Sequence, residues 1–282
     1  MPELDKRQQQ ALDALLSAKK LRELCPDTIR RVFLECLPKY KSLKDVDKAA
    51  RTELHRITGA FVTPENLALA ERLLDGWQSG DDDALARALA LHASTKERLP
   101  LADTDALYDR ICGCIGRPET VLDLACGFNP IYLASRGYDV TGLDLHGGAV
   151  RLINRWAQQK NLPARAQTAD LLSENALPEE AFDLALMMKL LPILDTQQSG
   201  AARHLIDSVP ARHIAVSFPT RTLGGRGVGM EAHYSQWFEG LLPEMWAIFD
   251  RYVQNDELIY LIQRNGGGTE HGEAVCGGHA HR

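Results

Sequence analysis

The stretch Val121-Leu-Asp-Leu-Ala-Cys-Gly-Phe-Asn-Pro130 decides the expected fold. Its apolar start predicts a buried strand over Val121–Ala125, and the small residues that follow predict a turn in which the backbone can approach a ligand closely. Asp123 stands near the end of this strand, and a second acid, Asp144, ends the next apolar run twenty-one residues later. Two successive strand ends therefore carry carboxylates, a pattern that is typical of nucleotide-binding α/β folds.

From Arg117-Pro118 onward, short apolar runs alternate with helical stretches. This alternation predicts an α/β fold with a mainly parallel sheet that is wrapped by helices and closed by an antiparallel hairpin. The expected elements are strands over Asp139–Leu143, Ala164–Thr168, Phe182–Met187 and His213–Phe218, helices over Gly147–Gln159 and Gln197–Ser208, and a hairpin of Ala247–Tyr252 with Glu257–Gln263.

The first 90 residues carry helical periodicity and little strand signal. Leu12, Leu15 and Leu16 mark a first helix, and Asp27 or Thr28 can cap a second one. We therefore expect an all-helical domain over residues 1–90, an α/β domain over 91–264 and a flexible tail over 265–282. Further helices are expected over Val46–Ile57, Pro64–Trp77, Asp82–Leu91 and, leading into the α/β domain, Asp103–Ile115.

The composition of the chain, 282 residues with 45% hydrophobic residues, is ordinary for a globular protein. The sequence has no apolar run of the length that a membrane span needs, and its polar N-terminus is unlike a secretory signal, so we expect a cytoplasmic protein. Six cysteines without a zinc-type spacing predict reduced thiols and no metal site. The His-rich end can bind a metal weakly, but its glycines favour a disordered tail.

Charge is distributed unevenly along the chain. The net charge is −6, yet the stretch from Lys19 to Arg56 holds eleven Lys or Arg against six Asp or Glu, a local excess of five positive charges. Such an asymmetry allows an acidic protein to present a surface to nucleic acid. On charge alone, an ordinary solvated helix face explains the stretch equally well.

The turn after the first strand argues against a dinucleotide. Its glycines do not form the G-x-G-x-x-G pattern, and Asn129-Pro130 stands where a phosphate-binding helix would start. A cofactor without a pyrophosphate fits better. Asp170-Leu171 adds an acid at the end of the third strand, and the series Asp123, Asp144 and Asp170 resembles the class I S-adenosylmethionine-dependent methyltransferases. The other reading is a Rossmann-type fold that uses another nucleotide or none.

Longer motifs extend this resemblance from a class to a family. The chain resembles the aminoglycoside-resistance 16S rRNA methyltransferases, the Arm/Rmt family, over roughly residues 10–264. The motifs are His92-Ala-Ser-Thr-Lys-Glu-Arg98, Asp123-Leu-Ala-Cys-Gly-Phe-Asn-Pro130, Lys189-Leu-Leu-Pro192, Ser217-Phe-Pro-Thr-Arg-Thr-Leu-Gly-Gly-Arg-Gly-Val-Gly-Met-Glu231, Cys25-Pro-Asp-Thr28 with Arg30-Arg31, and Gly59-Ala-Phe-Val-Thr-Pro64.

The resemblance implies that S-adenosylmethionine is the methyl donor and that N7 of one guanine in the decoding site of 16S rRNA, within the 30S subunit, is the acceptor. The modified base would block 4,6-disubstituted deoxystreptamine aminoglycosides, and a monomer is expected. Two rival readings remain. One is a methyltransferase for another rRNA position or a small molecule, and the other is a non-enzymatic ribosome-binding protein.

The resemblance also implies roles for individual residues. Asp144 would hold the ribose, Asp170 and Leu171 the adenine, and Arg98 the carboxylate of the cofactor through its guanidinium fork. Phe61 stands at a position that is often tyrosine in the family, so a hydroxyl contact is lost there. The expected cofactor-binding set is Phe61, His92, Ala93, Ser94, Arg98, Asp123, Ala125, Gly127, Asp144, Asp170, Leu171, Lys189 and Gln198.

Guanine N7 carries an in-plane lone pair and no hydrogen, so no proton has to leave it when it is methylated. We therefore expect no catalytic base, and catalysis by positioning, whose proximity contribution reaches roughly 7–11 kcal/mol. Lys189-Leu-Leu-Pro192 also stands where methyltransferases of exocyclic amines carry an Asn-Pro-Pro-Tyr type motif. The target base must be exposed or flipped from its stack.

Contacts to rRNA are expected from two places. Arg221 and Arg226 in a glycine-rich segment are natural phosphate contacts, unless they belong to an ordinary solvated loop. We expect the basic N-terminal face to bind the ribosome without taking part in cofactor binding. The expected rRNA-binding set is Lys19, Lys20, Arg30, Arg31, Arg51, Arg221, Arg226 and Met230.

Overall fold

The computed structural model describes residues 4–58, 61–221 and 229–265. Arg226 and the tail beyond residue 265 lie outside these residues. The chain forms two compact units: the first unit comprises the chain up to Glu97 together with Ala125–Ala176, and the second unit comprises Arg98–Leu124 and the chain from Leu177 onward. These units are defined by contacts and not by independent folding, so the domain boundaries at residues 90 and 264 stay a prediction.

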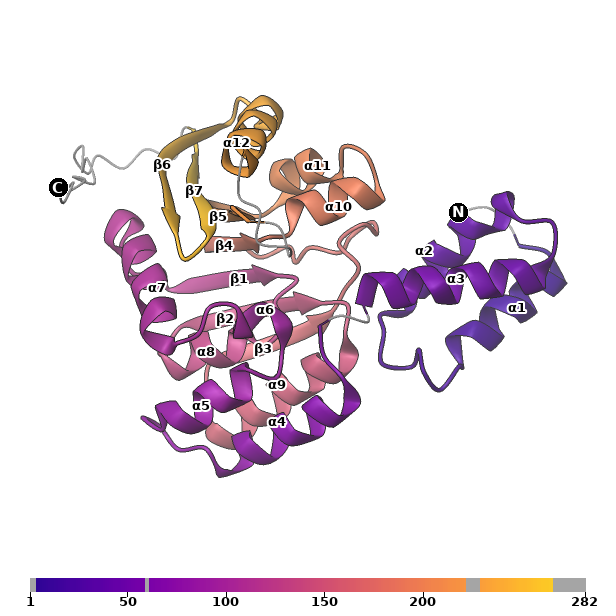
Figure 1. Ribbon diagram of the computed structural model, residues 1–282, viewed down its shortest axis with the longest axis horizontal. Helices are drawn as coiled ribbons and strands as arrows, with labels where there is room; N and C mark the ends of the chain where they lie inside the picture. Colours follow the sequence, from indigo (N-terminus) through magenta and orange to yellow (C-terminus); the bar gives the residue numbers. More distant parts are fainter. Residues whose placement is uncertain (1–3, 59–60, 222–228, 266–282) are drawn as a thin grey trace. The chain divides into compact units, whose positions relative to one another are not determined.

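The strands form a seven-stranded mixed sheet in the order β3-β2-β1-β4-β5-β7-β6 (Figure 1). The pairs β2/β3, β1/β4 and β4/β5 are parallel, and the pairs β5/β7 and β7/β6 are antiparallel. The expected mainly parallel sheet with a closing antiparallel hairpin is therefore confirmed. The strands are β1 (Thr120–Leu124), β2 (Asp139–Asp144), β3 (Ala164–Thr168), β4 (Phe182–Met188), β5 (Ala211–Pro219), β6 (Trp246–Gln254) and β7 (Glu257–Arg264).

In the first unit, a layer of helices covers β2 and β3. The helix α9 packs against both strands, and α4 packs on α9, where Trp77 and Trp156 meet edge to face with ring centroids 5.3 Å apart. Figure 1 shows α4, α5, α8 and α9 gathered beside these strands. The helices are α4 (Pro64–Gly76), α5 (Asp82–Leu89), α6 (Ala93–Lys96), α8 (Asn129–Ser135) and α9 (Gly147–Lys160).

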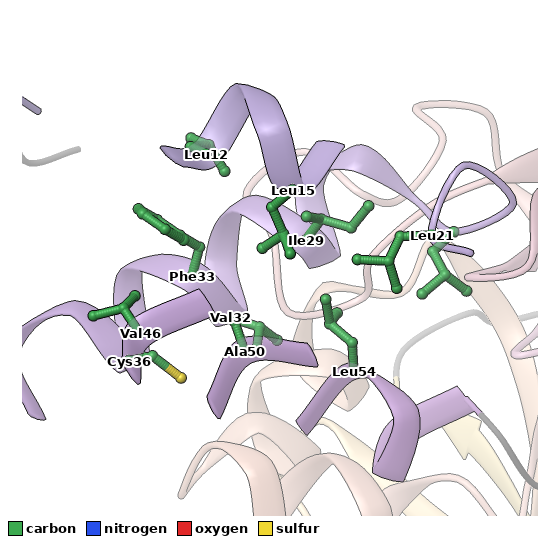
Figure 2. Close-up of a cluster of buried hydrophobic side chains, with 11 residues drawn as sticks. Leu12, Leu15, Leu21, Ile29, Val32, Phe33, Cys36, Val46, Ala50 and Leu54 are labelled. Carbon is green, nitrogen blue, oxygen red and sulfur yellow. The ribbon is translucent and has the colours of Figure 1, made fainter. Parts of the chain in front are cut away.

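The N-terminal part of the first unit is helical, as expected. Its helices are α1 (Lys6–Leu16), α2 (Pro26–Cys36), the 3-10 helix η1 (Leu37–Lys39) and α3 (Leu43–Thr58). Apolar side chains from the three α-helices form a cluster of their own (Figure 2). Leu15, Val32, Phe33 and Leu54 are fully buried in it. Each large side chain contributes about 1.5–3 kcal/mol by leaving water, so this cluster stabilises the helical part.

The start of α2 differs from the expectation. The helix begins at Pro26, whose missing N–H costs nothing in the first turn, and the residue before it makes no side-chain cap. Thr28 is fully buried inside the helix, and Asp27 pairs with Arg30 at 3.2 Å. The predicted cap by Asp27 or Thr28 is therefore wrong.

The described residues of the second unit hold β1, β4, β5, β7 and β6 with four helices. The helix expected over Gln197–Ser208 is α11, which begins only at Ala201, after Gly200 with φ +82°; α10, which ends at Gln197, was not expected. The helix α12 was not expected; its Phe238 is fully buried and meets Phe218 at 5.3 Å between ring centroids. The helices are α7 (Leu101–Ile115), α10 (Leu191–Gln197), α11 (Ala201–Ser208) and α12 (Met230–Leu241).

Across the described part of the chain, every helix is too short or too polar to span a bilayer.

Candidate functional site

Asp144 ends β2 and is held by backbone donors on both sides. Gly127 donates its N–H to one carboxylate oxygen at 2.8 Å, and His146 donates its N–H to the other oxygen at 2.8 Å. Each carboxylate oxygen can accept about two hydrogen bonds, and the side chain is only half-buried. Asp144 is therefore fixed in place while it keeps acceptor capacity for the hydroxyl groups of a ligand.

Gly127 occupies a position that another residue cannot take without strain. Its φ is +53°, and a Cβ atom there would lie 2.5 Å from Cε1 of His92 and 2.7 Å from Oγ of Ser94. The glycine turn therefore brings the backbone against the His92–Ser94 segment, where Nδ1 of His92 and Oγ of Ser94 lie 2.8 Å apart.

His92 is buried between two aromatic rings. Phe61 stacks on it at 6.1 Å between ring centroids, and Phe128 lies at 5.0 Å. Burial lowers the pKa of His92 to about 4, although Asp144 acts in the opposite direction. The imidazole is therefore neutral at physiological pH. Phe61 itself keeps 39% of its surface exposed, which leaves part of its ring open to a ligand.

Asp170, two residues after β3, is held differently from Asp144. Its side chain is 2% exposed, and one oxygen accepts the Nε–H of Arg31 at 2.8 Å while the other accepts the N–H of Leu172 at 3.0 Å. Arg31 comes from α2 and also pairs with Glu35 at 2.9 Å. Burial alone would lower the pKa of Arg31, but Asp170 and Glu35 raise it above its ordinary value, so the guanidinium stays charged.

The second unit contains a group of three charges, of which Arg98 and Glu257 are buried and Lys189 is half-buried. Glu257 begins β7, is 4% exposed, and lies 3.3 Å from Nε of Arg98 and 3.2 Å from Nζ of Lys189. Burial raises the pKa of Glu257, but the two cations outweigh it and hold that pKa below its ordinary value. Nε of Arg98 is buried and makes no hydrogen bond of good geometry to the described residues, so the guanidinium keeps a donor for a ligand anion.

The remaining residues that were expected to bind the cofactor range from buried to exposed. Asp123 is buried in β1 and near enough to Arg98 to raise the pKa of that guanidinium. Ala125 is exposed with φ +56°, Ala93 donates its N–H to the carbonyl of Phe61 at 2.9 Å, and Leu171 is half-buried. Gln198 is exposed just after α10.

The structure therefore groups the expected residues by unit. In the first unit, Phe61, His92, Ser94, Gly127 and Asp144 form one connected set. In the second unit, Glu257 was not predicted as a site residue, because an acid next to a turn usually points to solvent. The signal that could have found it is the unbroken apolar run Leu258–Ile262 directly after it, which indicates a buried strand.

The described residues of the expected rRNA-binding set are all at least partly exposed. Lys19 and Lys20 are exposed, Arg51 pairs with Asp47 at 2.8 Å, and Arg221 pairs with Asp256 at 3.0 Å. Such surface pairs contribute about 0–1 kcal/mol, so these arginines can exchange an acid for a phosphate at little cost. Met230 is half-buried at the start of α12.

A sheet of this order with strand-end acids is typical of nucleotide-binding α/β folds, and comparison with known proteins identifies the class. The model of the ribosomal RNA methyltransferase (FmrO) family matches residues 17–261. The chain therefore belongs to this family.

Individual relatives are similar over nearly their whole length. A 16S rRNA (guanine(1405)-N(7))-methyltransferase of Serratia marcescens is 49% identical over 257 residues, 91% of this chain and 98% of the relative. One of Micromonospora rosea is 33% identical, over 92% of this chain and 98% of the relative.

Solved structures agree with the sequence relatives. The 16S rRNA methyltransferase RmtF in complex with S-adenosyl-L-homocysteine has a TM-score of 0.83 and 52% identity, over 93% of this chain and 100% of that one. The 16S rRNA methylase RmtB has a TM-score of 0.80 and 44% identity, over 93% and 100%. The predicted class I methyltransferase fold and the predicted family are confirmed.

Proposed function

We propose that the chain transfers the methyl group of S-adenosylmethionine to N7 of a guanine in 16S rRNA, the base that its relatives' names number 1405. The observation that carries this proposal is the family membership together with three intact strand-end acids, Asp123, Asp144 and Asp170. A protein that had kept the fold only for binding ribosomes would have no reason to keep them.

The residues present fit this cofactor. The first unit supplies acceptors, and we assign Asp144 to the ribose hydroxyls and Asp170 with Leu171 to the adenine. The second unit supplies a buried donor, and we assign Arg98 to the carboxylate. His92, Ala93, Ser94, Ala125 and Gly127 are assigned to the methionine portion and to the closure of the pocket, with Phe61, Asp123, Lys189 and Gln198 as further contacts.

Methylation of guanine N7 does not require the protein to transfer a proton. When bound, S-adenosylmethionine supplies an electrophilic methyl carbon on a sulfonium. The N7 lone pair forms the new carbon–nitrogen bond, the carbon–sulfur bond breaks, and no proton leaves the nitrogen. The task of the residues is therefore to hold the reactants in line and to exclude water. Lys189 lies against Glu257 at 3.2 Å, and this ion pair favours a positioning role for it over that of a base.

We propose that the substrate is the 30S subunit. The basic stretch from Lys19 to Arg56 would contact rRNA phosphates, and Arg221 and Met230 would act nearer the target base. Binding should then weaken steeply with salt, because phosphate contacts release counterions. We further propose that the enzyme acts as a monomer in the cytoplasm and that the modified ribosome resists 4,6-disubstituted deoxystreptamine aminoglycosides.

The test is to incubate purified 30S subunits with the protein and S-adenosylmethionine, and to map the product. Cleavage at 7-methylguanine followed by primer extension on 16S rRNA should give a new stop at one guanine of the decoding site. A stop at another rRNA position would support the first rival reading. Cofactor binding without any methylation of 30S subunits or free rRNA would support a small-molecule substrate, and absence of cofactor binding would support a non-enzymatic protein.

A further inference from the structure

Asp170 depends on a residue from the helical N-terminal part of the chain. The acid is nearly fully buried, and the guanidinium of Arg31 on α2 lies against it with Nε donating at 2.8 Å. A buried carboxylate without a cation and hydrogen bonds is strongly disfavoured. Both residues belong to the first unit, so this ion pair joins two parts of one compact body.

Arg31 differs in surroundings from its neighbour Arg30. The side chain of Arg31 is 14% exposed, whereas that of Arg30 is 37% exposed and pairs with Asp27 on the same helix. Adjacent positions on a helix point about 100° apart, so one arginine faces inward and the other outward. The two arginines therefore have different tasks, although they carry the same charge in the same basic stretch.

The chain next to Asp144 is also tied to the helical part. The N–H of Cys25 donates to the carbonyl of Leu145 at 2.8 Å, and the N–H of Gly147 donates to the carbonyl of Glu23 at 2.6 Å. Leu145 follows Asp144 directly, and Gly147 comes two residues after Leu145. The segment that leads into α2 is thus hydrogen-bonded to the loop that follows Asp144. The helix α2 itself supplies Arg31, the cation that pairs with Asp170.

We propose that Arg31 is a positioning residue of the cofactor site, which acts through Asp170 and not through rRNA. This inference rests on the proposed assignment of Asp170 to the adenine of S-adenosylmethionine. The Nε–H of Arg31 holds one oxygen of the carboxylate, while Nη1 is held by Glu35, and the remaining acceptor capacity of Asp170 then serves the amino group of the ligand. The expectation that the basic N-terminal face takes no part in cofactor binding is revised at this one position.

A phosphate contact for Arg31 conflicts with the geometry. To reach a phosphate, the side chain would have to leave Asp170, and the acid would then be buried without its cation. Arg30, Lys19 and Lys20 can reach phosphates at no such cost. Changing Arg30 and Arg31 together would mix two effects, so the experiment must change them separately.

The experiment compares Arg31→Met with Arg30→Met in titration calorimetry with S-adenosylmethionine. We expect Arg31→Met to weaken cofactor binding by at least about tenfold, the effect of a hydrogen bond to a charged group. Arg30→Met should leave the cofactor Kd within about twofold and raise the KM for 30S subunits instead. Circular dichroism and the melting temperature establish that both variants are folded. An unchanged cofactor Kd in folded Arg31→Met would overturn the proposal.

A double-mutant cycle separates positioning from a general structural role. Asp170→Asn should weaken cofactor binding, and in that background Arg31→Met should change the Kd by less than about twofold, since the carboxylate on which it acts is gone. Independent, additive losses would contradict the proposal.

Arg31→Lys keeps the charge but lacks the guanidinium that bonds Asp170 through Nε and Glu35 through Nη1, so its cofactor Kd should fall between those of the wild type and Arg31→Met. If Arg31→Met does not fold, the comparison of Arg31→Lys with Arg30→Lys takes its place, and equal cofactor Kd values there would overturn the proposal. If Asp170→Asn binds the cofactor normally while the wild type methylates 16S rRNA, the adenine assignment fails and the proposed function stands.

Discussion

The two units of the molecule use charge in opposite ways. In the first unit, Asp144 and Asp170 are held by a few donors each and keep acceptor capacity, and the neighbouring His92 is neutral. In the second unit, the carboxylate of Glu257 lies between Arg98 and Lys189. The hydrogen-bonding group that is left for a ligand there is a donor, the Nε–H of Arg98. The first unit therefore offers acceptors, which suit hydroxyl and amino groups, and the second unit offers a donor, which suits a carboxylate.

The largest expected effect is a loss of stability on removal of Glu257, the carboxylate that pairs with Arg98 and Lys189 in the second unit. Glu257→Ala leaves the buried Arg98 and the half-buried Lys189 without their carboxylate, and we expect a loss of about 3–5 kcal/mol in the free energy of unfolding. Urea denaturation measures it. The control is Glu231→Ala, which removes an exposed carboxylate 2.7 Å from Arg251 and should cost about 1 kcal/mol or less. Equal losses in the two variants would show that Glu257 is an ordinary surface acid.

The neutral histidine of the first unit predicts a dependence of stability on pH. An unfolded His92 titrates near pH 6.5, and the folded one near pH 4. The unfolded state therefore takes up the proton first as the pH falls. His92 contributes stability above pH 6.5, and this contribution is lost between pH 6.5 and 4, by about 3 kcal/mol. Urea titrations at several pH values give the free energy of unfolding, which should decline less steeply below pH 6.5 in His92→Gln than in the wild type. The same pH dependence in both proteins would mean that His92 is solvated.

The acceptor role of Asp144 predicts an effect on binding. Asp144→Ala should weaken binding of S-adenosylmethionine by roughly 1.5–3 kcal/mol, the range for hydrogen bonds to a charged group. Asp139→Ala serves as the control, since Asp139 begins the same strand, is half-buried like Asp144 and pairs with Arg165 at 3.6 Å. Titration calorimetry measures both variants. Unchanged affinity in Asp144→Ala would remove this acid from the site.

Much of the fold could be predicted because periodicity and turn residues are local signals. The strand over Ala164–Thr168 has its predicted bounds, and the acid series at the strand ends lies where the topology requires. The helix α12 was missed because its aromatic residues pack on Phe218, a tertiary contact that masks the helical pattern.

The site was harder to predict in two places, and both depend on contacts that are distant in sequence. Arg30 and Arg31 look alike in the sequence, and only the fold decides which of them faces Asp170, 139 residues away. Glu257 meets Arg98 from 159 residues away. Sequence motifs predicted residues for contact with a ligand, but not the residues, such as Glu257, that hold them in place.

The central claim is that this enzyme acts by positioning and needs no general base. It is tested most directly by the single-turnover rate of methylation of bound 30S subunits between about pH 6 and 8.5. We predict a rate that is nearly constant over this range, because guanine N7 loses no proton. Substitution of Arg221 should slow capture of the base without changing that profile. A log-linear rise of the rate with pH that disappears in Lys189→Met would contradict the account and identify a nucleophile that must be deprotonated.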